Sequence, residues 1–538
     1  MTVADAVGRA LAELGADHVF GVVGSGNFHV TNALIAGGAR YVAARHEGGA
    51  ATMADAYART SGKLGVLSVH QGCGLTNAMT GIAEAAKSRT PMVVLAAEVT
   101  SPRSNFFVDQ TALATSVGAV AERVTSASSA VDTVVRAVRR ATHERRTVVL
   151  NLPLDLQAEP APVGSVEPVP PYSPPAPDPS AVEALAAAIT KARRPVFVAG
   201  RGARHARAEL ERLAERCGAL LATSAVANGL FAGNPWSLGI SGGFANPLAV
   251  ELISGADLVV GWGCALNTWT TRHGTLIGSA AGVAQVDLDA DALGAHRPVD
   301  LGVVGDVRAV AAALRVGAAP GYRSPGLASR IARSGRWRDV PFTDESEVDR
   351  IDPRALSTRL DDLLPAERVI GVDSGNFMGY PSAYLSVPDE RGFCFTQAFQ
   401  SIGLGLATAI GAALARPDRL PVAALGDGGG LMGIAELETV VRLGLPMVVV
   451  VYNDSGYGAE IHHFGPAGHS LDTVRFADTD LAAIGRGFGC TALTVRRRDD
   501  LVGVTRWLDG PRDTPLLIDA KVTTRRASWW LEEAFRGH

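Results

Sequence analysis

Short apolar runs alternate with longer stretches of helical character from the start of the chain. In the first 157 residues, runs rich in Val and Leu occur at 18–23, 65–69, 91–95 and 147–151. Runs this short are typical of strands that are buried on both faces. Strands that alternate with helices pair in parallel, because each helix returns the chain to the same edge of the sheet. The pattern therefore predicts a parallel sheet covered by helices on both faces.

The same alternation returns twice, after connectors of a different composition. A proline-rich segment at 159–179 is unsuited to helix or central strand. A polar, glycine-containing connector covers about 316–350. The further apolar runs include 195–199, 258–261, 284–288, 422–425 and 447–451.

We therefore expect an α/β protein of three doubly wound parallel-sheet domains, at 1–157, 180–314 and 351–538. The sequence Pro-Met-Val-Val occurs at both 91–94 and 446–449. This echo is compatible with a duplication that relates the first and last domains.

Two strand ends in the last domain carry acidic residues. The run at 422–425 leads into Gly-Asp-Gly, centred on Asp427, and the run at 447–451 leads to Asn453 and Asp454. Glycines let backbone N–H groups approach an anion, and a carboxylate beside them can hold a hard cation against it. Gly-Asp-Gly alone could be a surface turn, but the complete strand–loop–helix–strand pattern favours a Mg²⁺-diphosphate site.

With this motif the chain resembles the thiamine diphosphate enzymes, in the branch of acetolactate synthase, benzoylformate decarboxylase and pyruvate decarboxylase. The family motif begins with Gly-Asp-Gly and ends in a pair that is usually Asn-Asn, where this chain has Asn453 and Asp454. The resemblance implies thiamine diphosphate and Mg²⁺ as cofactors. It implies metal ligands from the side chains of Asp427 and Asp454 and the backbone carbonyl of Gly456. It covers nearly the whole chain and implies pyrimidine-binding, middle and diphosphate-binding domains, in that order.

A second motif, Arg45-His46-Glu47, precedes an apolar helical stretch. A carboxylate at a helix N-terminus is favoured by the helix dipole, so Glu47 could be only a helix-start residue. In the thiamine family the glutamate of this motif shares a proton with the aminopyrimidine and promotes formation of the ylid. The resemblance therefore implies that Glu47 is catalytic, which requires a carboxylate of raised proton affinity in a dry pocket.

The resemblance also assigns cofactor contacts. Ile402 matches the bulky apolar residue that holds the cofactor bent, although an ordinary core isoleucine is the alternative. The backbone carbonyl of Gln400 matches the acceptor for the 4′-amino group. The residues expected to line the diphosphate are Ser374, Gly375, Asn376, Gly428, Gly429 and Gly458.

Several histidines could handle protons on the substrate. His70 stands at a strand end, at the distance where benzoylformate decarboxylase has a histidine, and an imidazole titrates near neutral pH. His29 follows a loop that faces the cofactor in relatives. We take His70 and His29 as catalytic candidates, with a purely structural role as the alternative for each. His46 should point to the other face, and His462 and His463 follow the metal loop.

Composition narrows the class of protein. The 538 residues are 47% hydrophobic and carry a formal net charge of −4, so nothing basic suggests nucleic acid. The longest apolar runs fall far below the roughly 20 residues of a membrane span. The N-terminus lacks the pattern of a signal peptide. Five dispersed cysteines argue for reduced thiols, so we expect a cytoplasmic protein.

The leading hypothesis is decarboxylation of a 2-oxo acid, followed by carboligation of the enamine to a second carbonyl, an aldehyde or ketone. The alternative is a simple 2-oxo acid decarboxylase or carbon–carbon lyase. A non-catalytic paralogue with a structural or regulatory role is the alternative of another class. Phe106 falls near the position where acetolactate synthase has a glutamine that contacts substrate. The sequence therefore does not identify the donor and acceptor substrates. The resemblance implies a homodimer or homotetramer with active sites at the subunit interface.

Overall fold

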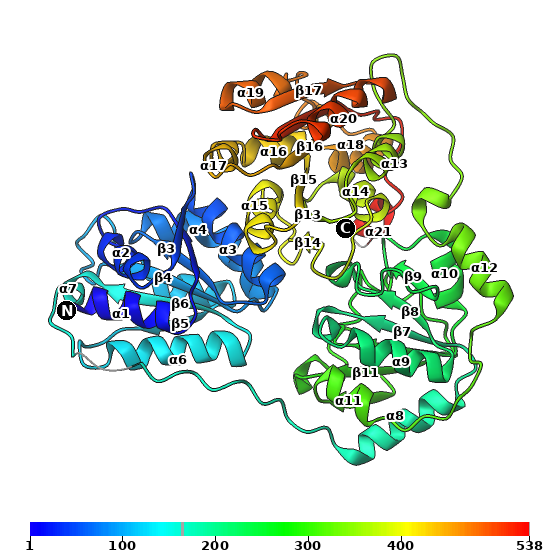
Figure 1. The fold of residues 1–538 in the computed structure, drawn as a ribbon, viewed down its shortest axis with the longest axis horizontal. Coiled ribbons are helices and arrows are strands. Elements are labelled where there is room, and N and C mark those ends of the chain that lie inside the picture. The colour runs from blue at the N-terminus through cyan, green and yellow to red at the C-terminus, as the bar shows by residue number, and fades with distance from the viewer. Residues whose placement is uncertain (163–165, 537–538) are drawn as a thin grey trace.

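The structure is a computed structural model that describes residues 1–162 and 166–536. Three α/β domains surround a central gap in the ribbon view (Figure 1), and each contains one six-stranded parallel sheet. The predicted fold class is confirmed. Among the described residues, no helix combines the length and apolarity needed to cross a bilayer.

The first sheet has the strand order β2-β1-β3-β4-β6-β5. Its strands are β1 (His18–Gly21), β2 (Arg40–Ala43), β3 (Gly65–Val69), β4 (Met92–Glu98), β5 (Val120–Arg123) and β6 (Thr147–Pro153). Its helices are α1 (Val3–Glu13), α2 (Phe28–Ala36), α3 (Glu47–Ser61), α4 (Cys73–Lys87), α5 (Gln110–Ser116), α6 (Ala130–His143) and α7 (Leu154–Gln157). Successive strand residues face opposite sides, so Val66 packs with α1, α2 and α6 while Leu67 packs with α3 and α4.

The middle sheet has the order β12-β11-β10-β7-β8-β9. Its strands are β7 (Pro195–Ala199), β8 (Leu220–Thr223), β9 (Ser237–Ile240), β10 (Leu258–Trp262), β11 (Gly282–Asp287) and β12 (Leu301–Val304). Its helices are α8 (Pro179–Lys191), α9 (Arg207–Cys217), α10 (Pro247–Ser254) and α11 (Val307–Ala313). The connector expected at 316–350 contains a further helix, α12 (Pro325–Ser334). Its Leu327 and Ile331 pack into the middle-domain core, so this connector is a docked element.

The third sheet has the order β14-β13-β15-β16-β18-β17. Its strands are β13 (Arg368–Val372), β14 (Phe393–Phe395), β15 (Leu420–Gly426), β16 (Val448–Asn453), β17 (Thr491–Val495) and β18 (Leu516–Lys521). Its helices are α13 (Pro353–Leu363), α14 (Gly379–Tyr384), α15 (Gly405–Ala415), α16 (Asp427–Met432), α17 (Glu436–Arg442), α18 (Gly458–Phe464), α19 (Leu481–Phe488), α20 (Val502–Asp509) and α21 (Leu531–Phe535).

The first and third domains share one hydrophobic core. Met53 of α3 and Ile82 of α4 belong to the same buried cluster as Ile410 of α15 and Leu437 of α17. Helices α3 and α15 lie against each other between the two sheets, as Figure 1 shows. A continuous apolar core of this kind fixes the two domains relative to each other.

Candidate active site

Asp427 and Asp454 lie at the carboxyl ends of two adjacent strands. Strand β15 pairs with β16 in parallel, with Gly426 opposite Tyr452, so the residues that follow each strand emerge side by side. The pKa of Asp427 is raised by burial. The pKa of Asp454 is raised well above its usual value, by burial and then by the charge of Asp427. The two carboxylates therefore favour a shared proton, or a cation, over two bare charges.

This donor pair fits a hard divalent cation. Carboxylate oxygens are the ligands that Mg²⁺ prefers, and a cation between the two groups would relieve their repulsion. Gly456 lies close to them, since its backbone N–H opposes the rise in the pKa of both carboxylates. Within residues 1–162 and 166–536, no group of three His, Cys, Asp or Glu side chains forms a metal cluster. A third ligand from the chain would thus be a neutral oxygen, and the backbone carbonyl of Gly456 stays our prediction.

Glycine at position 458 allows a close approach in this loop. A Cβ there would collide with the Oδ2 atom of Asp454 and press on Asn376. A residue with a side chain would displace the carboxylate from the strand end. The absence of a Cβ therefore leaves room beside the carboxylate for an anion and its cation.

Asp373 holds the loop that carries Ile402, a role that the sequence did not reveal. Its carboxylate accepts N–H groups from Ser374 at 2.8 Å, Gly403 at 3.0 Å and Leu404 at 3.2 Å. Burial raises the pKa of Asp373 to about 6, although these N–H groups oppose that shift. A carboxylate that follows a buried strand was the available signal.

All eleven predicted cofactor and metal residues of the third domain line one cavity of 1290 Å³. They are Ser374, Gly375, Asn376, Gln400, Ile402, Asp427, Gly428, Gly429, Asp454, Gly456 and Gly458. Gln400 adopts a φ of 61°, which is uncommon for a residue with a side chain.

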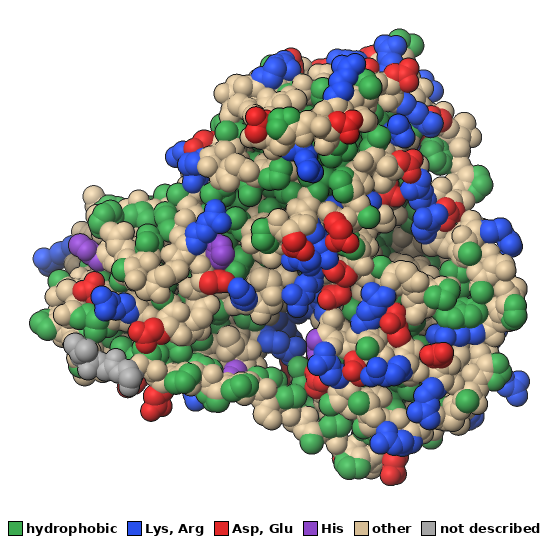
Figure 2. Space-filling view, viewed as in Figure 1, with side chains coloured by type: hydrophobic (Ala, Val, Ile, Leu, Met, Phe, Trp, Pro, Cys, Tyr) green, Lys and Arg blue, Asp and Glu red, His purple; other side chains and the backbone are tan. Residues whose placement is uncertain are grey.

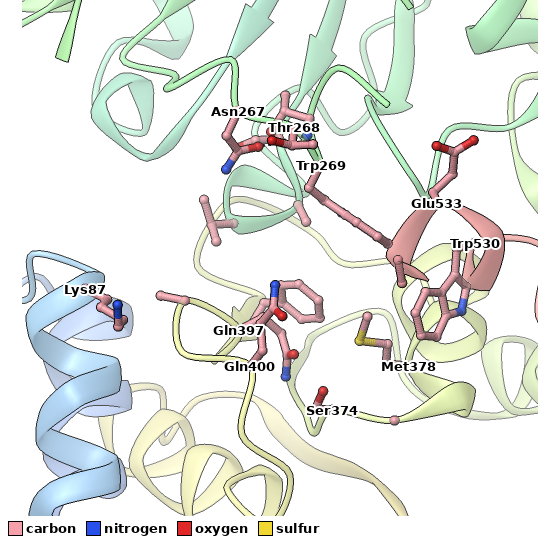
Figure 3. A pocket seen from close by; sticks show the side chains of 18 of the residues that line it. Lys87, Asn267, Thr268, Trp269, Ser374, Met378, Gln397, Gln400, Trp530 and Glu533 are labelled. Carbon is pink, nitrogen blue, oxygen red and sulfur yellow. Dashed lines mark hydrogen bonds between the residues drawn. The ribbon is translucent and has the colours of Figure 1, made fainter. Parts of the chain in front are cut away.

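The rest of the cavity wall comes from elements that the sequence analysis did not assign to a site. Figure 3 shows Gln397 and Gln400 between Trp269 of the middle domain and Ser374 of the third. Trp530 and Glu533 close another side. Trp530 is buried, and its indole N–H has no hydrogen-bond partner among the described residues. The C-terminal segment therefore forms part of the wall.

One side of the cavity is cationic. Arg89, Arg145 and Arg201 line it, and the pKa of Arg201 is lowered to about 9 by burial and by the neighbouring arginines, which include Arg59. Figure 2 shows a hollow where the three domains meet, with Lys or Arg side chains at its wall. Arg89 is paired with Asp289 at 2.8 Å.

A second group of predicted residues gathers in the first domain. Glu47 begins α3 and is half-buried, and it accepts a hydrogen bond from the Nδ2 atom of Asn77 at 3.0 Å. His70 follows β3, and its Nδ1 atom accepts the N–H of Gly26 at 3.2 Å. The pKa of His70 is lowered by burial, while the charge of Glu47 opposes that shift. The structure therefore brings Glu47 and His70 together, with Asn77 as a hydrogen-bond partner of Glu47.

The other histidines take different places. His29 is exposed on the first turn of α2, and no hydrogen bond joins it to Glu47 or His70 among the described residues. His46 caps α3, since its Nδ1 atom accepts the N–H of Gly48 at 3.0 Å. His463 stacks on Phe535, with 4.0 Å between ring centroids. These positions give His46 a structural role.

The two groups of residues do not meet within one chain. None of Glu47, His70 and His29 is among the described residues that line the cavity around Asp427. The first domain thus presents one half of the expected site and the third domain presents the other.

Family comparisons match all three domains. The thiamine pyrophosphate (thiamine diphosphate) enzyme families match with an N-terminal binding domain at 1–119, a central domain at 182–314 and a C-terminal binding domain at 373–520. A sulfoacetaldehyde acetyltransferase of Rhodobacter capsulatus is 31% identical over 86% of this chain and 83% of its own.

Two further relatives carry other activities in their names. An acetolactate synthase large subunit of Parasynechococcus marenigrum is 29% identical over 95% of this chain and 86% of its own. A probable 2-ketoarginine decarboxylase of Pseudomonas aeruginosa is 30% identical over 93% and 90%. The chain therefore belongs to the thiamine pyrophosphate-dependent enzymes, as an acetolactate synthase-like member of that family.

Proposed function

We propose that the protein decarboxylates a 2-oxo acid and transfers the remaining acyl unit to a second carbonyl compound. The observation that carries the proposal is the cavity that joins the adjacent carboxylates of Asp427 and Asp454 to Gln400 and Ile402. Its 1290 Å³ exceeds the roughly 300–1,000 Å³ of a typical ligand pocket, which leaves room for a substrate beside a cofactor.

We assign each residue of the third domain a role in holding the cofactor. Asp427, Asp454 and Gly456 would bind Mg²⁺, and the metal would bind the diphosphate. Thiamine diphosphate, when bound, would supply a carbon nucleophile for the carbonyl of a 2-oxo acid. The backbone carbonyl of Gln400 would accept its amino group, and Ile402 would support its bend.

We assign proton handling to the first domain. Glu47 would exchange a proton with the aminopyrimidine, and Asn77 orients its carboxylate through the 3.0 Å hydrogen bond. His70 accepts a backbone N–H at Nδ1, so its neutral form carries the proton on Nε2, from which it could donate to substrate. His29 is the second candidate, because its exposed ring is free to meet a partner surface.

The separation of the two half-sites supports a homodimer or homotetramer. A second copy of the chain would bring its Glu47 to the cavity around Asp427, and a two-fold axis would generate two equal sites. The alternative, decarboxylation without transfer, is favoured by the relative named as a 2-ketoarginine decarboxylase. The relatives named as acetyltransferases and acetolactate synthases favour transfer.

A substrate panel tests the proposal. Purified protein with Mg²⁺ and thiamine diphosphate would be given 2-oxo acids, each with and without an aldehyde or ketone acceptor. Release of CO₂ together with a transfer product, such as a 2-hydroxyketone, supports the proposal. Release of CO₂ with only the free aldehyde, under every acceptor, would establish the decarboxylase alternative. An inert protein that binds the cofactor would indicate a non-catalytic paralogue.

A further inference from the structure

A carboxylate of the first domain is buried in the cofactor loop of the third. Glu84 on α4 is fully buried. Its Oε1 atom accepts the N–H of Ala398 at 3.1 Å, and its Oε2 atom accepts the N–H of Phe399 at 2.6 Å. These residues directly precede Gln400, whose positive φ needs external support, and Ile402 follows two positions later.

Arg59 neutralises this carboxylate and contacts the same segment. Its Nη2 atom lies 2.7 Å from Glu84 and 2.7 Å from Asp55, and its Nη1 atom donates to the carbonyl of Phe395 at 3.1 Å. Burial alone would raise the pKa of Glu84, but Arg59 and the backbone N–H groups outweigh burial and lower it. Glu84 is therefore a charged anchor for the loop.

The third domain sends an equivalent carboxylate in the opposite direction. Glu436 on α17 is buried, and its Oε1 atom accepts the N–H groups of Arg45 at 3.0 Å and His46 at 3.1 Å. Its Oε2 atom accepts the hydroxyl of Thr439 at 2.6 Å. A Cβ at Gly49 would collide with Oε1. Glu436 thus fixes the backbone immediately before Glu47.

An internal repeat relates the two carboxylates. The sequence Gly-Ile-Ala-Glu occurs at 81–84 and again at 433–436. Each copy is followed by Pro-Met-Val-Val, at 91–94 and 446–449, which leads into β4 and β16. The two glutamates therefore occupy equivalent places in two related domains.

We propose that Glu84 and Glu436 are reciprocal positioning residues, each reaching into the other domain to fix a loop that presents cofactor-facing groups. Glu84 holds the loop of Gln400 and Ile402, and Glu436 holds the entry to Glu47. Neither glutamate lines the cavity, so both act through backbone that they hold. The purpose of the loops rests on the proposed function, whereas the two clamps are contacts of the chain itself.

Hydrogen–deuterium exchange on the unloaded protein, resolved to single amides, tests the clamps. In Glu84→Gln the oxygen that Arg59 and Ala398 contact can be retained, and the NH₂ donor then faces the N–H of Phe399. Exchange at Phe399 should therefore rise roughly tenfold or more while Arg45 and His46 stay protected. In Glu436→Ala the reverse pattern is expected.

The amide variant gives a sharper test at position 436. The backbone N–H groups of Arg45 and His46 both donate to Oε1 of Glu436. The amide oxygen of Glu436→Gln can accept both of these hydrogen bonds, so the two amides should exchange at the wild-type rate. Glu438→Gln is the matched control, because among the described residues the carboxylate of Glu438 contacts side chains, those of Arg45 and of Arg442 on its own helix, and no backbone N–H. It should leave the amides of Arg45 and His46 protected. Gly49→Ala should reproduce the effect of Glu436→Ala by steric displacement.

The functional half is read from binding and turnover. Glu84→Gln should weaken thiamine diphosphate binding about tenfold, and Glu436→Ala should lower kcat with nearly unchanged cofactor affinity. If each variant lost amide protection equally at both loops, the proposed clamps would be refuted, because that result indicates a general loss of structure. If each variant lost protection only at its own loop but kept the wild-type cofactor affinity and kcat, the proposed positioning role would be refuted. A wild-type protein that binds no cofactor would refute the proposed function and leave the clamp result standing.

Discussion

Asp454→Asn should stabilise the protein without cofactor while weakening its hold on Mg²⁺. Asp454 and Asp427 face each other with raised pKa values, which burial causes and mutual repulsion increases at Asp454. Two unit charges about 4 Å apart repel by about 4 kcal/mol at an effective dielectric constant of 20. A shared proton removes part of this repulsion in the wild type. We therefore expect that neutralising Asp454 raises the free energy of unfolding by about 1–4 kcal/mol.

The gain is measurable as a thermal midpoint in the presence of a chelator. Each kcal/mol moves the midpoint of a domain of this size by about 2–4 °C. The sign of the pH dependence follows from the raised pKa values. The folded state holds protons more tightly than the unfolded state, so its stabilisation is full at low pH and is lost as pH rises through the folded pKa. The advantage of the variant over the wild type should therefore grow from about pH 5 to pH 7.5.

Calorimetric titration of Mg²⁺ with thiamine diphosphate present gives the other half. Loss of one ligand charge should weaken Mg²⁺ binding about tenfold, because ligand charge tunes affinity for hard cations. The control is Asp418→Asn in the same domain, where the aspartate is exposed and paired with Arg416, so little gain is expected. A lower midpoint for unloaded Asp454→Asn, or an advantage that shrinks with rising pH, would refute the reasoning.

Three further outcomes test the remaining assignments. Glu47→Gln should bind thiamine diphosphate yet slow hydrogen exchange at its C2 atom by orders of magnitude, since an amide cannot shuttle the proton; unchanged exchange contradicts this role. Mixed subunits of Glu47→Gln and Asp427→Ala should regain activity in hybrids, where one site is intact, and proven hybrids without activity would show that each chain builds its own site. His70→Ala should keep cofactor affinity and lose turnover by roughly 10²–10⁴, and normal turnover would move the search to His29.

The sequence predicted which residues of the candidate site one sheet would bring together. Asp427 and Asp454 were predictable because the carboxyl ends of adjacent parallel strands must meet, and the register of β15 on β16 places them so. The predicted diphosphate-lining glycines and Ser374 lie at the same edge of the sheet. Glu47 was likewise predicted at a helix start, and His70 at a strand end, of the first domain.

Contacts between domains were not predictable in this way. Glu84 meets Phe399, 315 positions away, and Glu436 meets Arg45, 391 positions away. Such pairs depend on how two finished domains dock, and no local period encodes docking. Helix α12 was not predicted from the sequence. Its buried residues are Leu327 and Ile331, and two apolar positions within a polar connector are too few to indicate a helical period.

The docking within the chain also supports the proposal that a second copy completes the site. Helices α3 and α15 share a buried core, and Glu84 and Glu436 contact the loops on either side of it. These contacts oppose a rotation of the first domain that would bring Glu47 into the cavity of its own chain. In one chain Glu47 stays half-buried beside Asn77. Under the proposed function, a carboxylate that exchanges a proton with the cofactor must be taken out of water. In the proposed dimer the partner surface that supplies the diphosphate site would also cover Glu47, so we expect activity to depend on assembly.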